Sequence, residues 1–419
     1  MANRLTIYIV IALILGLFTG WAMHEAIKTS APATAAVLKD ATQLFPILTT
    51  IFLRLIKMII APLVFSTLIV GIAHMGDSSA LGRVGLRALT WFIGASLVSL
   101  TLGLILVHLL QPGAGLALAL PPVSEASGVD KAAFNLKDFV THIVPASIVE
   151  ALAKNEIIQI VVFSVFAGVA ITSLGERAAP LVRGAEALAE VMLKVTNYVM
   201  ALAPVAVFAA VANSLAERGP EVIGNLGYFM ASFYLALMLL WTVLIAIGGL
   251  FLGRDVVPLV RAIRAPLLLA FSTASSEAAY PKTLEALEKY GVPPRIASFM
   301  LPLGYSFNLD GSMMYMTFAS LFIAQAYGIQ LTLSAQITML LVLMVTSKGI
   351  AGVPRASLVV VAATLPLFGI PEAGLLLILA VDQFLDMGRS ATNVVGNAVA
   401  TAVIARWESG RPARAEAVG

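Results

Sequence analysis

The most constraining feature of this chain is a series of long apolar segments, separated from one another by charged residues, prolines and glycines. The uninterrupted ones lie near residues 5–24, 43–74, 85–111, 157–175, 186–212 and 223–251. A helix needs about 20 apolar residues to cross the hydrocarbon core of a membrane. Charged residues make up 12% of the chain, which is about half the share usual in soluble domains. The sequence therefore predicts an all-α integral membrane protein.

The composition also excludes several classes of function. The 419 residues include no cysteine, so disulfides, iron–sulfur clusters and thiolate metal sites are ruled out. The net charge of +3 is small and the basic residues are spread over many loops, so we expect no nucleic-acid partner. The sequence contains no P-loop, GxSxG or paired metal-ligand motif. We therefore expect neither an enzyme nor a resident cofactor.

Loop charges predict how the chain is oriented in the membrane. If the N-terminus lies inside, basic residues such as Arg83, Arg177, Arg254 and Arg406 all fall on the same side. Residues 325–336, on the opposite side, contain no Lys or Arg. Basic residues favour the cytoplasmic side, so we expect a multi-pass protein of a bacterial inner membrane with both termini in the cytoplasm.

Two apolar segments, near 256–290 and 336–368, are interrupted at their centres. The first carries four hydroxyl residues and a carboxylate within 272–277, and the second breaks at 347–355. Irregular backbone at membrane depth is tolerated only where protein or a watery cavity covers it. Paired broken segments of this kind indicate the binding site of a transporter, because the N-termini of half-helices attract anions.

Two further spans, 302–315 and 382–397, carry polar groups that a lipid-facing helix should not contain. The second holds five polar residues at spacings of four, three, four and four, namely Asp382, Asp386, Arg389, Asn393 and Asn397. These spacings predict one stripe along a helix. A guanidinium and a nearby carboxylate would complement a zwitterion with an acidic side chain. The alternative is an internal Asp–Arg ion pair that holds helices together, with the asparagines as interhelical contacts.

Together these elements resemble the dicarboxylate/amino acid:cation symporter family, the glutamate transporters, and within it the proton-coupled bacterial branch. The resemblance covers nearly the whole chain. Its most specific motifs are the serine-rich stretch 272–277, Asn-Leu-Asp-Gly at 308–311, Gly-Ile-Ala-Gly-Val-Pro at 349–354, and the run 386–397. It implies eight transmembrane helices, two re-entrant helical hairpins and a homotrimer. In each subunit a transport domain would slide against a scaffold, as in an elevator.

The resemblance also divides the chain into segments. In order they are scaffold helices 1 and 2 (1–75), helix 3 of the transport domain (84–112), an external loop with scaffold helices 4 and 5 (113–219), helix 6 of the transport domain (222–252), re-entrant hairpin 1 (256–291), helix 7 (294–327), re-entrant hairpin 2 (331–369), helix 8 (372–408) and a cytoplasmic tail (409–419).

The family motifs also imply the roles of individual residues. Arg389 would hold the side-chain carboxylate of the substrate and Asp386 its amino group. The other implied substrate contacts are Ser275, Ser276, Ser312, Val353, Ser357, Ser390 and Asn393. The residues implied in cation or proton coupling are Ser96, Gly304, Asn308, Asp310, Asn393, Asn397 and Glu277.

Substrate and coupling ion are predicted from single residues. Asp386 favours an acidic amino acid, glutamate or aspartate, over a C4-dicarboxylate, because an unpaired buried carboxylate would repel a dianion. Sodium-driven relatives carry an aspartate where this chain has Asn397 and hydroxyl residues where it has Phe92 and Ala95, so we expect coupling to protons. A residual sodium site at Asn308, Asp310 and Asn393 remains the alternative.

Three further interpretations complete the prediction. The glutamate that potassium-exporting animal relatives use is replaced here by Met316, so we expect no potassium counter-transport. Arg355 either supplements Arg389 or faces solvent. A passive anion channel would line a continuous pore with like groups, whereas the opposite charges of this chain cluster in one short stretch, which favours an occluded site.

Overall fold

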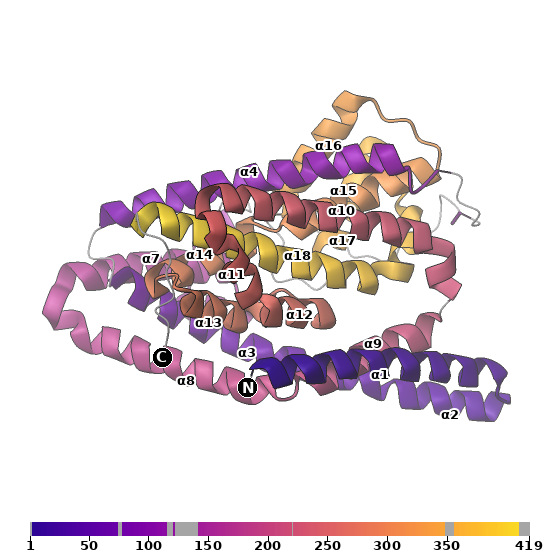
Figure 1. Cartoon of the computed structure of the whole chain (residues 1–419), viewed down its shortest axis with the longest axis horizontal. Coiled ribbons are helices and arrows are strands. Elements are labelled where there is room, and N and C mark those ends of the chain that lie inside the picture. The colour runs from indigo at the N-terminus through magenta and orange to yellow at the C-terminus, as the bar shows by residue number, and fades with distance from the viewer. Residues whose placement is uncertain are drawn as a thin grey trace.

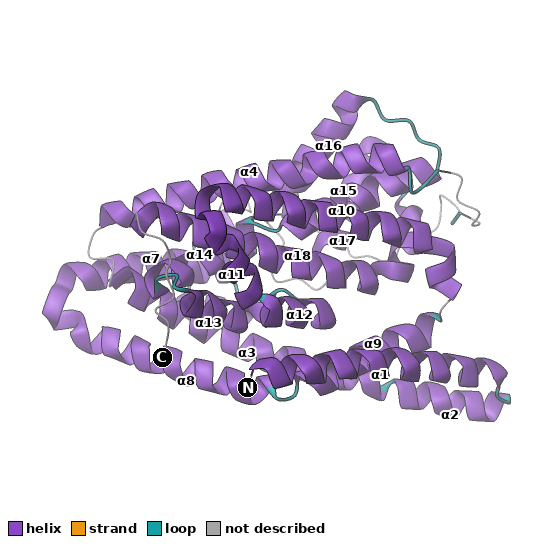
Figure 2. Cartoon of the chain, viewed as in Figure 1, coloured by secondary structure: helices purple, strands orange, loops and turns teal. Residues whose placement is uncertain are grey.

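The computed structural model of the chain describes residues 2–73, 78–114, 120–121, 141–219, 221–347 and 356–409. Within these residues every regular element is helical (Figure 2), which confirms the all-α prediction. The α-helices are α1 (Ala2–Thr29), α2 (Pro32–Thr42), α3 (Leu44–Ala73), α4 (Ser78–Leu110), α6 (Ile148–Lys154), α7 (Ile157–Leu174), α8 (Ala179–Met200), α9 (Ala203–Arg218), α10 (Glu221–Leu252), α11 (Val256–Ala262), α12 (Arg264–Thr273), α13 (Tyr280–Tyr290), α14 (Pro294–Phe307), α15 (Asp310–Ala326), α16 (Leu333–Thr346), α17 (Ala356–Thr364) and α18 (Leu375–Ser409).

Among the described residues, five segments are long and apolar enough to cross a membrane. They are Ile7–Thr29, Pro32–Ala73, Gly82–Leu110, Ile157–Met200 and Leu226–Ala262. Their mean hydropathy lies between 1.9 and 2.5 and many of their side chains face outward, as lipid contact requires. The chain is therefore a multi-pass membrane protein.

The apolar stretch near 186–212 differs from the single span that its composition predicts. The structure divides it into α8, which ends at Met200, and α9, which begins at Ala203. Pro204 stands at the start of α9, where its missing N–H costs no helical hydrogen bond. The same proline would interrupt one continuous helix, which explains the break.

The helices form two groups that meet at α3, α12 and α14 (Figure 1). Helices α1, α2, α8 and α9 lie along one side of the molecule, where α1 packs on α9 and α3 packs on α7, α8 and α9. On the other side α18 packs against α10, α12, α14 and α15, and α4 packs on α15. Contacts of α3 with α14 join the two groups.

Two helix breaks lie deep inside the second group. Helix α12 ends at Thr273, and the next residue, Ala274, has a left-handed backbone with φ 50°. The chain then forms a short 3-10 turn, η3 (Glu277–Ala279), and continues as α13. The other break separates α14 from α15 at Asn308 and Leu309, whose backbones are not helical. The helices that flank the two breaks, α12, α14 and α15, all pack against α18.

Helix α15 stands at the centre of this group. Its residues from Asp310 to Ala324 are all buried, on every face of the helix. A helix that is apolar all round must be surrounded by other helices, and α15 is enclosed by α4, α10, α17 and α18. The polar residues of its first turn are therefore shielded from lipid and face the site described next.

Candidate functional site

The polar stripe of α18 faces the break between α14 and α15. Four stripe residues form hydrogen bonds with that break or with the first turns of α15. Tyr315 donates a hydrogen bond of 2.6 Å to Asp382, and Asn308 donates one of 3.2 Å to Asn397. The remaining contacts join Arg389 and Asn393 to Ser312, and the amide of Gly311 to the Asn393 oxygen. The helical spacing predicted for the stripe therefore orients all of its members inward.

Arg389 is the centre of the site. Its Nε donates a hydrogen bond of 2.7 Å to Asp386 Oδ1, and its Nη2 is paired with the same oxygen. Its Nη1 donates to Ser357 Oγ at 2.6 Å and to Ser312 Oγ at 3.3 Å. The side chains of Arg389 and Asp386 are each 14% exposed, so the pair is largely enclosed by protein.

The aromatic ring of Tyr315 also packs against the guanidinium of Arg389. The Cζ atom of Arg389 lies 5.9 Å from the centroid of the ring, a cation–π distance. The hydroxyl group of the same tyrosine is bonded to Asp382, whose side chain is 3% exposed. One residue therefore contacts both the guanidinium and a second acidic side chain.

The two interrupted segments contribute to the site in different ways. Ser357, at the start of α17, reaches Arg389 directly. Ser275 instead accepts a hydrogen bond of 3.2 Å from the amide of Ala278, within the turn that leads into η3. Ser275 and Ser276 are half-buried and make no hydrogen bond to α18 among the described residues. Val353 and Arg355 lie outside the described residues, as does the motif 349–354.

A second polar cluster lies one turn further along α18. Asn308 and Asp310 are completely buried, and Ser99 of α4 donates a hydrogen bond of 3.5 Å to Asp310 Oδ1. Three buried polar atoms near this cluster have no hydrogen-bond partner among the described residues: Ser96 Oγ, Asn308 Oδ1 and Asn397 Nδ2. Buried polar atoms left unpaired are costly, so this cluster has spare capacity to hold a cation or water.

Two glycines allow this close packing. A Cβ atom at Gly304 would run into Asn397 Oδ1, and one at Gly396 would run into Asp310 Oδ2. Oxygen donors with one carboxylate suit a hard monovalent cation. Asn393, the third residue of the predicted sodium site, uses its oxygen to accept from the Gly311 amide and its amide to donate to Ser312. Its side chain is therefore engaged in the site of Arg389.

The sequence reasoning did not single out Ser99, Tyr315 or Asp382 as site residues. Ser99 follows Ser96 by three positions on α4, so the two share a face and only the rotation of the helix shows which one contacts Asp310. Asp382 belongs to the predicted stripe, and Tyr315 ends the predicted polar span. Their positions in the stripe and in the polar span were the features of the sequence that could have identified these two residues.

A multi-pass helical membrane protein in which interrupted helices surround a largely buried, charged site belongs to the class of secondary carriers. The chain is a member of the sodium:dicarboxylate symporter family, whose profile matches residues 5–407. This membership confirms the resemblance seen in the sequence. The family consists of transporters, so the prediction that the chain is not an enzyme is confirmed as well.

Similar proteins come from several bacteria. The proton/glutamate-aspartate symporter of Escherichia coli strain K12 is 41% identical over 408 residues, which cover 96% of this chain and 92% of that protein. The proton/sodium-glutamate symport protein of Bacillus caldotenax is 39% identical over 406 residues, or 96% and 93% of the two chains. A C4-dicarboxylate transport protein of Rhizobium johnstonii is 42% identical over 373 residues, or 88% and 84%.

Proposed function

We propose that this carrier imports an acidic amino acid, glutamate or aspartate, together with protons. The observation that carries the proposal is the pairing of Arg389 with Asp386 in a largely buried site. An arginine fork binds a carboxylate, and a carboxylate beside it binds an ammonium group. The names of the relatives from Escherichia coli and Bacillus caldotenax support this substrate class.

A C4-dicarboxylate such as succinate is the second candidate, because a relative of that name is just as similar in sequence. Asp386 argues against it. A dianion entering the site would meet a carboxylate that it cannot neutralise, whereas an amino acid brings its own positive charge to this position. The pairing therefore favours a substrate with an amino group.

In the proposed complex, Arg389 releases part of its contact with Asp386 and takes the side-chain carboxylate, assisted by Ser312. Asp386 receives the amino group. The remaining predicted contacts, to the main-chain carboxylate, come from Ser276, Ser390, Asn393 and the backbone of Val353, with Ser275 and Ser357 closing the pocket. The present hydrogen bond from Arg389 to Ser357 supports a closed position of α17 over the pocket.

We further propose an elevator mechanism in a homotrimer of the inner membrane, with eight membrane helices, two re-entrant hairpins and both termini in the cytoplasm. The interruption after α12 supports the first hairpin, and the break predicted from the sequence at 347–355 supports the second. The packing of the helices into two groups supports a scaffold and a transport domain, with α3 at the interface between them. Each hairpin would then close one side of the pocket.

For the driving ion, we infer protons rather than sodium. Asn397 offers an amide in place of a carboxylate, and the buried ring of Phe92 lies where sodium-driven relatives have a hydroxyl residue. A site with one carboxylate fewer binds a hard cation more weakly. Sodium stays the second candidate, because Asn308 and Asp310 still offer buried oxygens beside Ser96.

Uptake of radiolabelled glutamate into liposomes that contain the purified protein tests the proposal. We expect an inward proton gradient to drive uptake with or without sodium, and aspartate to compete better than succinate. Uptake that requires sodium would refute proton coupling. Strong competition by succinate alone would refute the role of Asp386.

The same vesicles give the stoichiometry. A potential of 100 mV is worth about 2.3 kcal/mol for each charge moved, and a tenfold concentration ratio about 1.4 kcal/mol. Glutamate carries one net negative charge, so import with one proton is electroneutral and does not respond to a potassium diffusion potential. Import with two or more protons is accelerated by a negative interior.

A further inference from the structure

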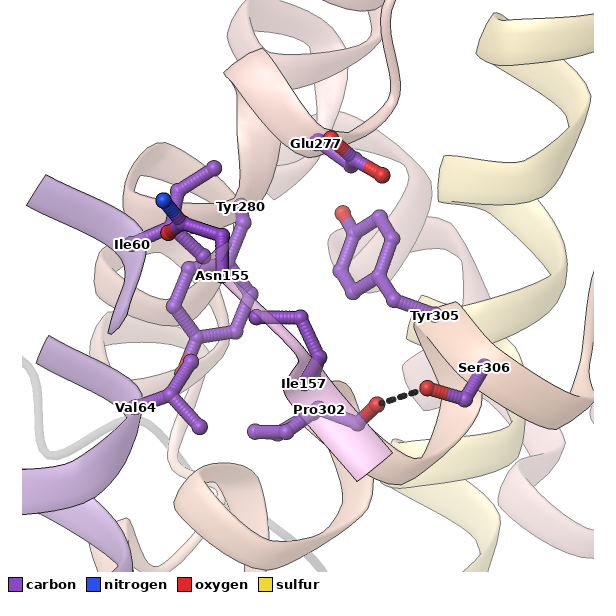
Figure 3. A pocket seen from close by; sticks show the side chains of 9 residues that line it. All are labelled: Ile60, Val64, Asn155, Ile157, Glu277, Tyr280, Pro302, Tyr305 and Ser306. Atoms are coloured by element: carbon purple, nitrogen blue, oxygen red, sulfur yellow. Dashed lines mark hydrogen bonds between the residues drawn. The ribbon is translucent and has the colours of Figure 1, made fainter. Parts of the chain in front are cut away.

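A small cavity lies where η3 meets the group of helices around α3. It is lined on one side by Ile60 and Val64 of α3 and by Ile157 of α7, and on the other by Glu277 and Tyr305 (Figure 3). Its volume is about 20 Å³, which is room for about one water molecule. On the second side, the hydroxyl group of Tyr305 points toward the carboxylate of Glu277.

The carboxylate of Glu277 has no fixed partner. Its side chain is half-buried, and it makes neither a hydrogen bond nor an ion pair with any described residue. The charged groups that face it are Lys57 of α3 and Arg389 of α18, both beyond ion-pair distance. The other titratable groups at the cavity are the phenols of Tyr280 and Tyr305, which are neutral at physiological pH.

This setting suits a carboxylate that gains and loses a proton. The apolar side chains of Ile60, Val64 and Ile157, which share their wall with Asn155, disfavour the ionised form, whereas the two distant cations favour it. Neither form is locked in place by a hydrogen bond. A water molecule held in the small cavity would lie beside this carboxylate and would serve as its proton donor or acceptor.

The two other acidic groups of the site are less suited to this task. Asp386 is ion-paired with Arg389 and accepts a further hydrogen bond from Ser390, so protonation would break the pair that recognises the substrate. Asp310 is completely buried and enclosed by Gly396 and Ser99. Neither carboxylate lines the cavity beside Glu277.

Arg389 connects the carboxylate of Glu277 to the substrate. In the empty carrier the positive charge of this guanidinium, which Asp386 offsets in part, still favours the ionised form of Glu277. A substrate carboxylate bound to Arg389 compensates that charge, so the ionised form of Glu277 loses stabilisation and proton binding becomes easier. By thermodynamic linkage, a proton on Glu277 strengthens substrate binding by the same factor.

We propose that Glu277 binds the co-transported proton in the cavity between η3, α14 and α3, and that Arg389 couples this protonation to the binding of the anionic substrate. The inference rests on the proposed function and names the residue responsible for its coupling.

The test compares wild-type protein with E277Q, E277D and a matched control, E288Q, in liposomes. Glu288 belongs to the neighbouring helix α13, is half-buried and does not line the cavity. Two readouts are needed: accumulation of glutamate driven by a proton gradient, with proton entry followed by an internal pH dye, and exchange of external for internal glutamate at equal pH.

We expect E277Q to keep exchange, which requires no net proton movement, and to lose both accumulation and glutamate-dependent proton entry. E288Q should match the wild type in both readouts. Accumulation and proton entry by E277Q at wild-type levels would overturn the inference.

The aspartate variant covers the case in which E277Q is inactive in both readouts. E277D keeps a titratable group, so recovery of gradient-driven accumulation supports the inference. An E277D variant as inactive as E277Q would overturn it, because the position would then serve the structure alone. A wild-type protein that fails to transport glutamate, or needs sodium to do so, would refute the proposed function itself.

Discussion

Two nitrogens of Arg389, Nε and Nη2, donate to the same oxygen of Asp386, Oδ1. The second oxygen, Oδ2, makes no hydrogen bond with any described residue. The ion pair therefore leaves one carboxylate oxygen without a hydrogen bond to a described residue, while Nη1 of the guanidinium donates to Ser312 and Ser357. A ligand with both charges can bind to this pair without separating it completely.

The first prediction concerns D386N. The substitution removes the negative charge but keeps an oxygen that can accept from Arg389. We expect glutamate uptake to fall by about 10-fold or more, since a hydrogen bond to a charged group is worth about 1.5–3 kcal/mol. Succinate should at the same time become a better inhibitor of binding, because the carboxylate that repels it is gone.

Asp40 of α2 provides the matched control, because its side chain is exposed and far from α18 in the fold. D40N should leave both uptake and competition unchanged. If D386N lowered the affinity for glutamate and succinate equally, Asp386 would be only a structural partner of Arg389.

The second prediction concerns the hydroxyl group of Tyr315. Y315F removes the donor of the 2.6 Å hydrogen bond to the buried Asp382 but keeps the ring beside Arg389. The loss of one partner from a buried carboxylate costs about 1–3 kcal/mol, so we expect a lower thermal denaturation temperature in detergent. Substrate affinity should fall less, because the guanidinium keeps its contact with the ring.

Y8F serves as the control, since Tyr8 is 56% exposed on α1. Its denaturation temperature should equal that of the wild type. An equally unchanged temperature for Y315F would mean that other contacts of Asp382 suffice to stabilise it.

The third prediction concerns the close approach of α18 to α15. In G396A the new Cβ atom would run into Asp310 Oδ2 and lie 3.4 Å from Asn308 Nδ2. Because buried backbone on both helices prevents easy relaxation, we expect a loss of about 1–3 kcal/mol in stability and a clear loss of transport.

Gly94 of α4 has open space around it, so the same change at this position tests helix propensity alone. G94A should be neutral or stabilising by up to about 1 kcal/mol. Equal denaturation temperatures and equal transport for G396A and G94A would show that the contact at Gly396 is not restrictive.

The sequence was sufficient to predict the polar stripe, because helical geometry fixes which residues share a face. Asp386, Arg389, Asn393 and Asn397 are therefore directed inward as their spacing indicates. The polar stretch 272–277 likewise predicted a break, and α12 ends within it at Thr273. In both cases the residues that carry the pattern are close together in the sequence, so the pattern can be recognised without the fold.

Features that depend on the packing of distant segments were not predictable in this way. The break at Asn308 and Leu309 has no proline within it, and it becomes clear only when α14 and α15 are seen to pack separately on α18. The choice of Ser99 as the hydrogen-bond donor to Asp310 depends on the rotation of α4. No local pattern encodes that rotation.

The last prediction tests the driving ion through N397D. The Asn397 oxygen accepts from Asn308, and its Nδ2 has no hydrogen-bond partner among the described residues. An aspartate at this position would keep the accepting oxygen and replace the unpaired amide by a second acidic oxygen in the cluster that holds Asp310. Two carboxylates in one buried cluster repel each other unless a cation lies between them. We therefore expect sodium to stimulate glutamate uptake by N397D and to leave wild-type uptake unchanged.

The control for N397D is N197D on α8, where the side chain is exposed and accepts a hydrogen bond from Lys282. Glutamate uptake by N197D should not depend on sodium, as in the wild type. Sodium titrations of initial uptake rates at constant pH separate the outcomes. A sodium response in N397D alone assigns the ion preference to this one amide. Sodium-independent uptake by N397D would mean that Phe92 and the other substituted positions exclude the ion by themselves, because the added charge would then have been insufficient to hold it.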